Sequence, residues 1–429
     1  MSNRKNQSEE LRVKFLFDKR IGGAWGNEPD EENAVICIRA ADFDTHKISH
    51  RTNNLTRRSF SEEEINNKGL LLGDLIIEKS GGGENQPVGR VALFQLNETA
   101  LCSNFLEVLR PNTNRVLSQF AGYVLYSLWS NRTVIAAIKQ TTGIQNLDIG
   151  DYLDNKIALP KISRQKEIIA FLQSELKYID ALIDQKQRSV SVLVEKKRVL
   201  ISNAITHGID PSVKMKNSEI PWINCAPAHW KKTRLKFLGN IFYGLSQPPE
   251  YQKEGTALVR ATNIFRGEIK SEGVVYVNEN EIGGLKKITL QIGDIIVVRS
   301  GAYTGDSAII TSAWAGSIAG FDMIFRSNSA VCPEFLAILF LSEYVLDCQL
   351  IPASSRAAQP HLNAEELGNV MIELPPLPEQ IAIVKHLHAK LKNIEDVMNA
   401  TKRSIDFLME RREILISDTV TGQMEIPAA

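Results

Sequence analysis

The chain contains two copies of one long pattern, and this duplication limits its possible folds more than any other feature. Residues 12–16 (RVKFL) recur as residues 234–238 (RLKFL), 222 positions later. Residues 73–76 (GDLI) recur as residues 293–296 (GDII), 220 positions later. The offset drifts by only a few residues across each half, which indicates two copies of one large unit and not a short solenoid repeat. Two similar units create an approximate two-fold axis, and a nearly two-fold partner such as duplex DNA suits that arrangement.

The overall composition indicates a globular chain and does not by itself point to a nucleic-acid partner. With 429 residues, of which 43% are hydrophobic and 23% charged, the chain can form a packed core and should hold roughly two to four domains. Its 50 Lys and Arg residues balance its 50 Asp and Glu residues, which argues against nucleic acid wrapped over the whole surface. A local basic face is still compatible with this balance, because acidic residues can lie elsewhere.

The sequence carries no targeting segment and no metal-binding pattern that we identify. No stretch approaches the ~20 apolar residues of a membrane span, and residues 1–10 are polar, unlike a secretory signal. The five cysteines are scattered without a CxxC pair, so we expect neither a zinc site nor a disulfide framework. We therefore expect no membrane partner and a reducing, cytoplasmic location.

Two stretches, residues 164–207 and 379–421, are predicted to form long helices. Their apolar residues alternate in steps of four and three, the a/d rhythm of a coiled coil. The predicted seam of the first helix recurs 215 positions later in the second and comprises Leu172, Leu176, Ile179, Ile183, Lys186, Val190, Leu193, Lys197 and Leu200. The polar members recur in register, Lys186 as Thr401 and Lys197 as Arg412. Each helix of about 43 residues would extend roughly 65 Å.

This repeated seam favours pairing of the two helices with each other. If a two-fold axis relates the two units, the paired helices must be antiparallel. Polar residues at equivalent levels of a seam often fix its register. The alternative is two separate amphipathic helices, each packed on its own domain.

The segments 11–160 and 231–375 have the texture of irregular α+β domains with a curved sheet. Short β-like runs alternate with Gly, Asn and Ser turns. The predicted strands are residues 34–38, 70–77, 88–94, 257–259, 273–277, 294–299 and 307–310, and the predicted helices are residues 115–128 and 333–346.

Two matched pairs of loops are the candidates for ligand contact. Residues 79–87 and 299–305 follow equivalent strands, and each loop begins with a basic residue and continues with small ones. Glycines let backbone amides approach an anion or a base edge, although a plain hairpin turn is the commoner meaning of such a loop. Residues 140–147 and 354–362 form the second pair and are rich in side chains that hydrogen-bond bases or phosphates. Neither glycine-rich loop ends in Gly-Lys-Ser/Thr, so a P-loop is not expected.

Two segments of the sequence are distinctive. They are residues 208–222 (GIDPSVKMKNSEIPW), closed by His229-Trp230, and residues 359–362 (QPHL) followed by 374–380 (LPPLPEQ). Both resemble conserved parts of a known family, the specificity (S) subunits of type I restriction–modification systems. The first segment looks like the central connector of that family, and the second resembles its entry into the conserved helices. The first copy departs from the pattern at residues 161–164 (KISR), which weakens the signature locally.

The resemblance implies an α+β fold with two irregular α/β target recognition domains, related by pseudo-two-fold symmetry and separated by an antiparallel coiled coil of two long helices. The expected segments are a disordered or extended N-terminus (1–10), target recognition domain 1 (11–160), a first conserved spacer helix (161–208), a connector (209–230), target recognition domain 2 (231–375) and a second conserved spacer helix (376–429).

The resemblance also implies a non-catalytic, sequence-specific DNA-recognition subunit. Each domain would read one half of a bipartite, asymmetric target in double-stranded DNA, while the helices set the spacer and dock two methyltransferase subunits. Motor-nuclease subunits would join for cleavage. The chain itself shows no Asn/Asp-Pro-Pro-aromatic motif and no glycine-rich S-adenosylmethionine loop, so we expect no cofactor on it and S-adenosylmethionine, ATP and Mg on partner subunits. The alternatives are the DNA-reading portion of a different restriction–modification enzyme, or a coiled-coil scaffold that does not bind DNA.

Candidate DNA-contacting residues follow from the matched strands and loops, because Arg recognises guanine, and Asn or Gln adenine, through paired hydrogen bonds. The first candidates are Arg39, Arg260, Lys79 and Arg299, and the further candidates are Arg90, Gln145, Asn263, Arg266, Tyr303, Arg356, Gln359 and His361. An ordinary surface position or a hydrogen bond internal to the fold is the alternative role for each of them.

Overall fold

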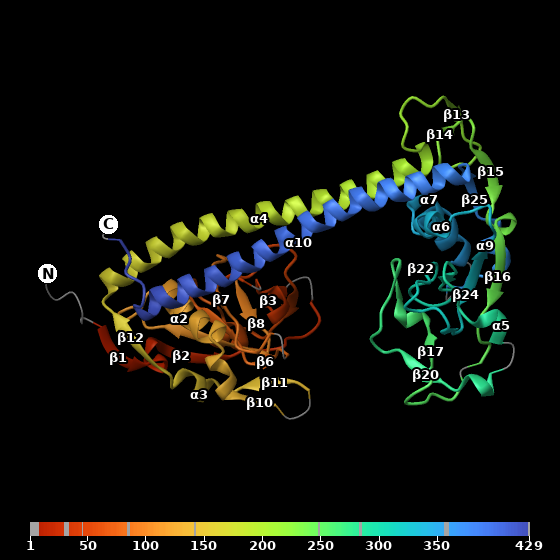
Figure 1. Ribbon diagram of the computed structural model, residues 1–429. Helices are drawn as coiled ribbons and strands as arrows, with labels where there is room; N and C mark the ends of the chain where they lie inside the picture. The colour runs from red at the N-terminus through yellow and green to blue at the C-terminus, as the bar shows by residue number, and fades with distance from the viewer. Residues whose placement is uncertain are drawn as a thin grey trace. The chain divides into compact units, whose positions relative to one another are not determined.

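The computed structural model describes residues 8–29, 34–44, 46–83, 86–140, 143–247, 249–282, 285–355 and 360–427 (Figure 1). The chain divides into two compact units. Unit 1 contains Met1–Arg188 and Thr401–Ala429, and unit 2 contains Ser189–Ala400. Each unit therefore combines one globular part with one end of each long helix.

Unit 1 is built on a four-stranded antiparallel sheet of order β2–β9–β5–β7 and a three-stranded sheet of order β4–β3–β8, in which β3 and β8 are parallel. A separate pair, β1–β12, precedes the first long helix. The strands are β1 (Ser8–Arg12), β2 (Phe17–Gly22), β3 (Ala34–Ile38), β4 (Arg57–Ser59), β5 (Leu75–Glu78), β6 (Ser80–Gly81), β7 (Val91–Leu93), β8 (Ala100–Cys102), β9 (Leu106–Pro111), β10 (Ile138–Gln140), β11 (Gln145–Leu147) and β12 (Lys156–Pro160). The short helices are α1 (Glu62–Lys68), α2 (Ser118–Ser130) and α3 (Ile149–Leu153).

Unit 2 repeats this topology. Its four-stranded sheet has the order β16–β24–β21–β22, its three-stranded sheet the order β20–β17–β23, and β15 pairs with β25. The strands are β13 (Met215–Asn217), β14 (Cys225–Pro227), β15 (Lys231–Arg234), β16 (Gly239–Tyr243), β17 (Thr256–Val259), β18 (Ile264–Phe265), β19 (Glu268–Ile269), β20 (Val275–Val277), β21 (Ile295–Val297), β22 (Ser307–Ile309), β23 (Ile318–Ala319), β24 (Met323–Ser327) and β25 (Met371–Leu374). The predicted α+β class and the duplication are thus confirmed.

A buried ion pair anchors the four-stranded sheet of each unit in the same way. Arg110 on β9 donates through Nε and Nη2 to the two carboxylate oxygens of Asp74, at 2.9 and 2.8 Å. Arg326 on β24 does the same to Asp294, at 2.8 and 2.6 Å. Both aspartates are 2% exposed, and two parallel charge-assisted bonds offset the cost of burying their charge. This arrangement explains why Gly-Asp precedes a strand in both halves of the sequence.

A buried glutamine ties each long helix to the globular part beside it. Gln165 and Gln380, both 0% exposed, lie in the first turns of the long helices. Each side-chain oxygen accepts a backbone N–H at 2.8 Å, from Leu117 in unit 1 and from Cys332 in unit 2. These backbone amides lie at the N-terminal ends of α2 and α6 (Pro333–Phe340). One glutamine in each unit therefore fixes the contact between a long helix and a shorter one.

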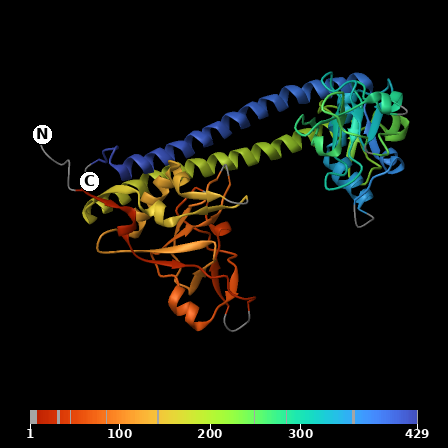
Figure 2. The same ribbon diagram turned by 90° about the horizontal axis from the view of Figure 1, so that it is seen from below.

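The two long helices, α4 (Ile162–His207) and α10 (Leu377–Thr421), begin two residues before their predicted starts and end where predicted. They lie side by side and antiparallel within each unit, as Figure 1 and Figure 2 show. In unit 1, Arg412 Nε donates to Asp180 Oδ1 at 3.1 Å. In unit 2, Lys197 Nζ donates to Glu395 Oε1 at 2.6 Å. The residue numbers of each pair add to the same total, so both units hold the helices in one antiparallel register.

The predicted seam is confirmed, and both long helices also join the globular cores. Every predicted seam position of α4 and α10 is buried or half-buried. In unit 1, Leu172 of α4 and Ile416 of α10 pack into one core with Phe120 of α2. In unit 2, Ile205 of α4 and Leu387 of α10 likewise pack into one core, that of unit 2. Pairing with each other and packing on the domains, which the sequence presented as alternatives, therefore occur together.

The structure also corrects one local expectation. The helix predicted over residues 333–346 is broken: α6 ends at Phe340, α7 (Glu343–Val345) follows, and a π-helical turn (Leu346–Leu350) leads into α8 (Ile351–Ser354). Of the N-terminal residues 1–10, residues 1–7 lie outside the described part, and the next three belong to β1. The remaining helices of unit 2 are α5 (Leu285–Ile288) and α9 (Ala364–Asn369).

Among the described residues, no single helix is both long and apolar enough to cross a membrane. One pair of helices, Pro333–Phe340 and Glu343–Ser354, is long and apolar enough only when the two are taken together, and they meet at a bend of 67°. Its apolar side chains belong to the core of unit 2.

The two cross-helix ion pairs should differ strongly in their contribution to stability. Arg412 has a side chain only 5% exposed, so Asp180→Ala leaves a buried charge without its carboxylate and should lower the free energy of unfolding by about 3 kcal/mol. Glu395→Ala removes the equivalent acid of an exposed pair and should cost less than about 1 kcal/mol. Urea unfolding of the two variants checks this, and equal losses would contradict it.

Candidate nucleic-acid interface

In unit 2, a cation and two aromatic rings meet at one end of the four-stranded sheet. Tyr243 ends β16, Phe321 precedes β24 and Arg299 follows β21. Because these strands are neighbours in the sheet, the three side chains lie together. The Arg299 guanidinium carbon is 4.7 Å from the Tyr243 ring centre and 4.4 Å from that of Phe321. We call this end of the sheet the cation–aromatic edge.

The stacked guanidinium of Arg299 is held further by His361. Arg299 Nη2 donates to His361 Nε2 at 3.1 Å, and His361 Nδ1 lies 2.8 Å from Ser300 Oγ. Arginine has no acceptor, so this geometry requires a neutral imidazole with its proton on Nδ1. His361, predicted to contact DNA, is therefore placed as a positioning residue for Arg299. A guanidinium fixed in this way is preorganised to donate two parallel hydrogen bonds.

The neighbouring candidates in unit 2 divide into exposed and internal residues. Arg260 follows β17, its guanidinium carbon lies 5.4 Å from the Tyr251 ring centre, and Nη2 donates to the Gly273 carbonyl at 2.7 Å. Asn263 is 1% exposed and its side chain accepts from the Arg260 backbone N–H at 3.1 Å. Asn263 therefore holds the turn and does not face solvent. Arg266 and Tyr303 have exposed side chains.

Unit 1 has a cation–aromatic edge of different composition. The strand registers place Phe105 at the position of Phe321, and Phe105 is 42% exposed. Its ring centre lies 6.3 Å from that of Trp25, and the Arg58 guanidinium carbon is 4.8 Å from the Trp25 ring centre. Lys79, the counterpart of Arg299, is half-buried, and its backbone N–H donates to the Phe105 carbonyl at 2.9 Å.

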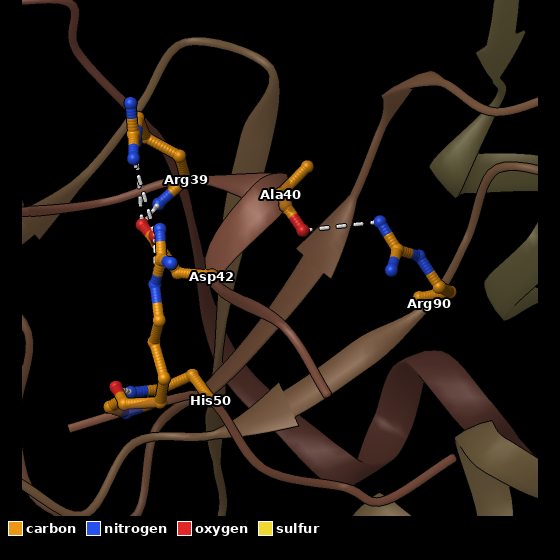
Figure 3. A network of polar contacts seen from close by, with 6 residues as sticks. Arg39, Ala40, Asp42, His50 and Arg90 are labelled. Carbon is orange, nitrogen blue, oxygen red and sulfur yellow. Dashed lines mark hydrogen bonds and ion pairs between the residues drawn. The ribbon is translucent and has the colours of Figure 1, made fainter. Parts of the chain in front are cut away.

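A charged network surrounds the turn that follows β3 in unit 1 (Figure 3). The buried carboxylate of Asp42 accepts from the Arg39 backbone N–H at 2.8 Å and from Arg51 Nε at 2.8 Å. Burial would raise the pKa of Asp42, but the Arg39 amide and the Arg51 and Arg39 guanidinium groups outweigh it and hold that pKa below its usual value. Arg39 keeps 37% of its side chain exposed, so it can face a ligand while it is oriented by Asp42.

Two further candidates in unit 1 have internal roles. Arg90 has a side chain only 14% exposed. It donates to the buried carboxylate of Glu78 and, through Nη2, to the Ala40 carbonyl at 3.1 Å (Figure 3). Gln145 is 8% exposed and accepts from the Val88 backbone N–H at 3.1 Å. We therefore leave these two residues out of the proposed contact surface. Arg356 and Gln359 lie outside the described residues.

The exposed aromatic residues are the part of the site that the sequence analysis missed. Trp25 and Phe105 in unit 1, and Tyr243 and Phe321 in unit 2, are each more than two-fifths exposed. A signal for two of them was available, because Trp25 lies two residues after Gly23 and Tyr243 lies directly before Gly244, and these glycines recur between the copies. At Gly23 and Gly244 a Cβ atom would approach a backbone oxygen to 2.0 Å, so these two positions must be glycine.

A buried acid distinguishes the edge of unit 2. Asp322 is 2% exposed and lines a cavity of about 300 Å³ together with Arg260 and Phe321. Burial raises the pKa of Asp322 to about 6, although the backbone amides of Arg299 and Ala261 lower it. The strand registers place a fully buried leucine, Leu106, at this position in unit 1. The carboxyl group is thus not required by the fold.

A cavity in unit 1 lies apart from the edge residues. A cavity of about 520 Å³ in unit 1 is lined by Lys47, Tyr123 and Asp180 among others and borders α4. Within the described ranges, no group of three or more His, Cys, Asp or Glu side chains is arranged to hold a metal ion.

Known proteins share both the sequence pattern and the fold. Residues 227–405 match the family model for the type I restriction modification DNA specificity domain. The chain is 24% identical to the type I restriction enzyme MjaVIII specificity subunit of Methanocaldococcus jannaschii, over 85% of this chain and 82% of that protein. A solved structure from work on complex assembly in a type I restriction–modification system covers 97% of this chain and 98% of its own, with a TM-score of 0.70 at 14% identity. The HsdS subunit of Thermoanaerobacter tengcongensis covers 98% of both chains, with a TM-score of 0.52 at 15% identity.

The buried carboxyl group of Asp322 should make stability depend on pH. Its pKa is raised from the ordinary 3.8 to about 6, so the folded state holds the proton more tightly than the unfolded state. Stability therefore falls as the pH rises from about 4 to about 6, and the full loss persists at higher pH. Asp322→Asn should therefore raise the free energy of unfolding by roughly 2–3 kcal/mol near pH 8. The gain should shrink as the pH falls from 6 towards 4. Urea unfolding at both ends of this range checks the prediction, and a gain independent of pH would contradict it.

Proposed function

We propose that this chain is a specificity subunit of a type I restriction–modification system and that it reads a bipartite, asymmetric DNA target, with one half assigned to each unit. The match of residues 227–405 to the DNA specificity domain and the similarity to known specificity subunits support this proposal. DNA and other subunits of the restriction–modification complex are the partners of such a subunit, which is not itself the catalytic component. Each unit would read its own half-site with its own side chains.

The observation that carries this proposal is a pair of equivalent edges with unequal chemistry. In unit 2 the Arg299 guanidinium lies against the ring of the exposed Phe321. At the equivalent end of the sheet in unit 1, the counterpart residue is Lys79, which is bonded through its backbone N–H to the carbonyl of the exposed Phe105. A point-like ammonium group and a planar, stacked guanidinium present different donor geometries to a base edge. One scaffold therefore supports two different half-sites.

The paired helices would set the distance between the half-sites. Two readers held in one register meet DNA at a fixed number of base pairs, with a phase given by the helical repeat of ~10 bp. The antiparallel register, repeated in both units, supports this role. Unread bases between the half-sites would be sensed only through shape and stiffness.

The long helices also offer a pair of equivalent apolar patches for partner subunits. On α4 in unit 2, Val192 and Val199 are 66% and 44% exposed. On α10 in unit 1, the residues 215 positions later, Phe407 and Ile414, are 70% and 49% exposed. A spacing of seven places both members of each patch on one helix face. Two copies of one patch support the proposal that two identical methyltransferase subunits dock here, one on each unit.

The chemistry would then lie on the partner subunits. This chain carries no adenine-methylation motif and no S-adenosylmethionine loop, so S-adenosylmethionine is assigned to the methyltransferase subunits and ATP and Mg to the motor-nuclease subunits. Methylation requires the adenine to leave the base stack, and the specificity subunit would supply the position at which this happens.

Substitution of the stacked cation should affect one half-site only. Arg299→Lys keeps the charge but loses both the stacking between Tyr243 and Phe321 and the planar donor pair. Discrimination at the half-site of unit 2 should fall by about 1–3 kcal/mol at one base position, while the other half-site is unchanged. Long-read methylation mapping in a host that carries the complex measures this. Lys79→Arg is the matched control and should leave the half-site of unit 2 intact. Equal loss at both halves would contradict the division of labour.

The apolar patches should each hold one methyltransferase subunit. Phe407→Glu with Ile414→Glu should yield complexes that retain one methyltransferase subunit, and Val192→Glu with Val199→Glu should remove the other one. Native mass spectrometry of the purified complex counts them. Val194→Glu is the control, because Val194 is 52% exposed but lies two residues, or about 200°, around the helix from Val192. Unchanged stoichiometry in both double variants would rule out these patches.

A further inference from the structure

The hairpin β18–β19 of unit 2 carries an arginine in a backbone conformation that arginine disfavours. The pairs Ile264↔Ile269 and Phe265↔Glu268 leave a two-residue loop of Arg266 and Gly267. Both loop residues have positive φ, 44° and 96°, as the tightest hairpin turn requires. Glycine, asparagine or aspartate is the ordinary choice at the first of these positions, because a Cβ atom clashes with the backbone there.

The fold itself holds this hairpin firmly, so the strain is not relieved by motion of the tip. Ile264 is 2% exposed within an apolar cluster of unit 2. The Gly267 N–H donates to the Ser307 carbonyl at 2.9 Å, and a Cβ atom at Gly267 would approach the Leu341 side chain to 2.9 Å. The second loop residue must therefore be glycine, whereas nothing in the core selects arginine for the first.

The contacts of Arg266 within the protein engage only part of its side chain. The side chain is 57% exposed, and its Nε lies 3.5 Å from Oδ1 of Asp306, whose side chain is 7% exposed. This contact is at the long end of the ion-pair range and involves one of the three guanidinium nitrogens. A strained backbone conformation at an exposed polar residue is commonly retained for function.

The surroundings of the tip match a nucleic-acid ligand. Phe265 is 45% exposed, and Tyr303 is 51% exposed. Their ring centres are 6.4 Å apart. The Lys270 ammonium lies 4.3 Å from the Phe265 ring centre. Neighbouring exposed aromatic rings beside a cation are unusual on a surface that meets only water. The major groove of DNA is wide enough to admit a two-stranded β-ribbon.

Among the described residues, unit 1 shows no such ribbon at the equivalent position. There Phe43 pairs with His50, with six residues between them, and Phe43 is buried at 6% exposure. Lys47 in this segment lies 3.4 Å from Asp180 Oδ2 on α4, so this loop is directed to its own helix. Any role of the hairpin is therefore specific to unit 2.

We infer that the β18–β19 hairpin enters the major groove of the half-site of unit 2, where Arg266 donates to the O6 and N7 atoms of a guanine. The inference rests on the proposed DNA-reading function and names a specificity-determining residue within it. Lys270 would lie near the phosphate backbone and Phe265 against a base methyl group or sugar. The disfavoured conformation is the cost of aiming the guanidinium outward from a two-residue turn.

The test uses the complete complex and two variants of one residue. Arg266→Asn suits the turn but removes the cation beside the buried Asp306 carboxylate, so these opposing effects should change the melting temperature by only a few degrees. It should still reduce discrimination for one guanine in the half-site of unit 2 by about tenfold or more. Arg266→Lys keeps both the charge and the strain, so it should leave the melting temperature unchanged and still lose that discrimination. Methylation mapping identifies the target, and duplexes with each base of that half-site replaced then measure binding.

The outcomes separate this inference from the proposed function. If both variants keep full discrimination at every position of that half-site, the hairpin does not read DNA, although the wild-type complex still does. If discrimination at several positions or in both half-sites falls together, Arg266 acts on the fold and the inference is wrong. If the wild-type complex modifies no bipartite sequence, the proposed function itself fails.

Discussion

The antiparallel register of α4 and α10 is the constraint on which the rest of this structure depends. Neither unit has a complete core without both helices: Leu172 and Ile416, which lie far apart in the chain, share the core of unit 1. The ion pairs Asp180–Arg412 and Lys197–Glu395 occur at matched levels, so a shift of one helix would break both pairs and expose the seam. Buried polar groups in a helical seam often specify register in this way.

Because the chain is duplicated, comparison of its two units separates the residues that the fold requires from those that differ with function. What both units need is repeated closely, as with the Asp–Arg pair under each four-stranded sheet and the buried glutamine at each helix start. What differs lies at the cation–aromatic edge. Unit 1 places a leucine where unit 2 buries Asp322, and an Arg39–Asp42 ion pair where unit 2 has Arg260 beside the uncharged Asn263. Divergence at one edge of a shared fold is the pattern expected of two readers with different targets.

Much of the fold could be predicted from the sequence, but less of the site. The helices, their seam and several strands, β3 among them, lie where periodicity placed them, because a spacing of 3.5 or 2 residues directly reflects which face is buried. The roles of Arg90, Asn263, Gln145 and His361 could not be predicted in the same way. A polar residue in a loop gives the same sequence pattern whether its side chain faces a ligand or, like Asn263, accepts a backbone N–H.

By itself, the sequence determined the duplication, the α+β class, the paired helices and the family resemblance, since each depends on patterns that extend along the chain. Only the tertiary structure decided which cations meet aromatic rings, because strands β16, β21 and β24 bring Tyr243, Arg299 and Phe321 together across some eighty residues of chain. It also decided that Arg266 sits at positive φ and that Asp322 is buried. Contacts between distant segments depend on strand order and register, which local periodicity does not encode.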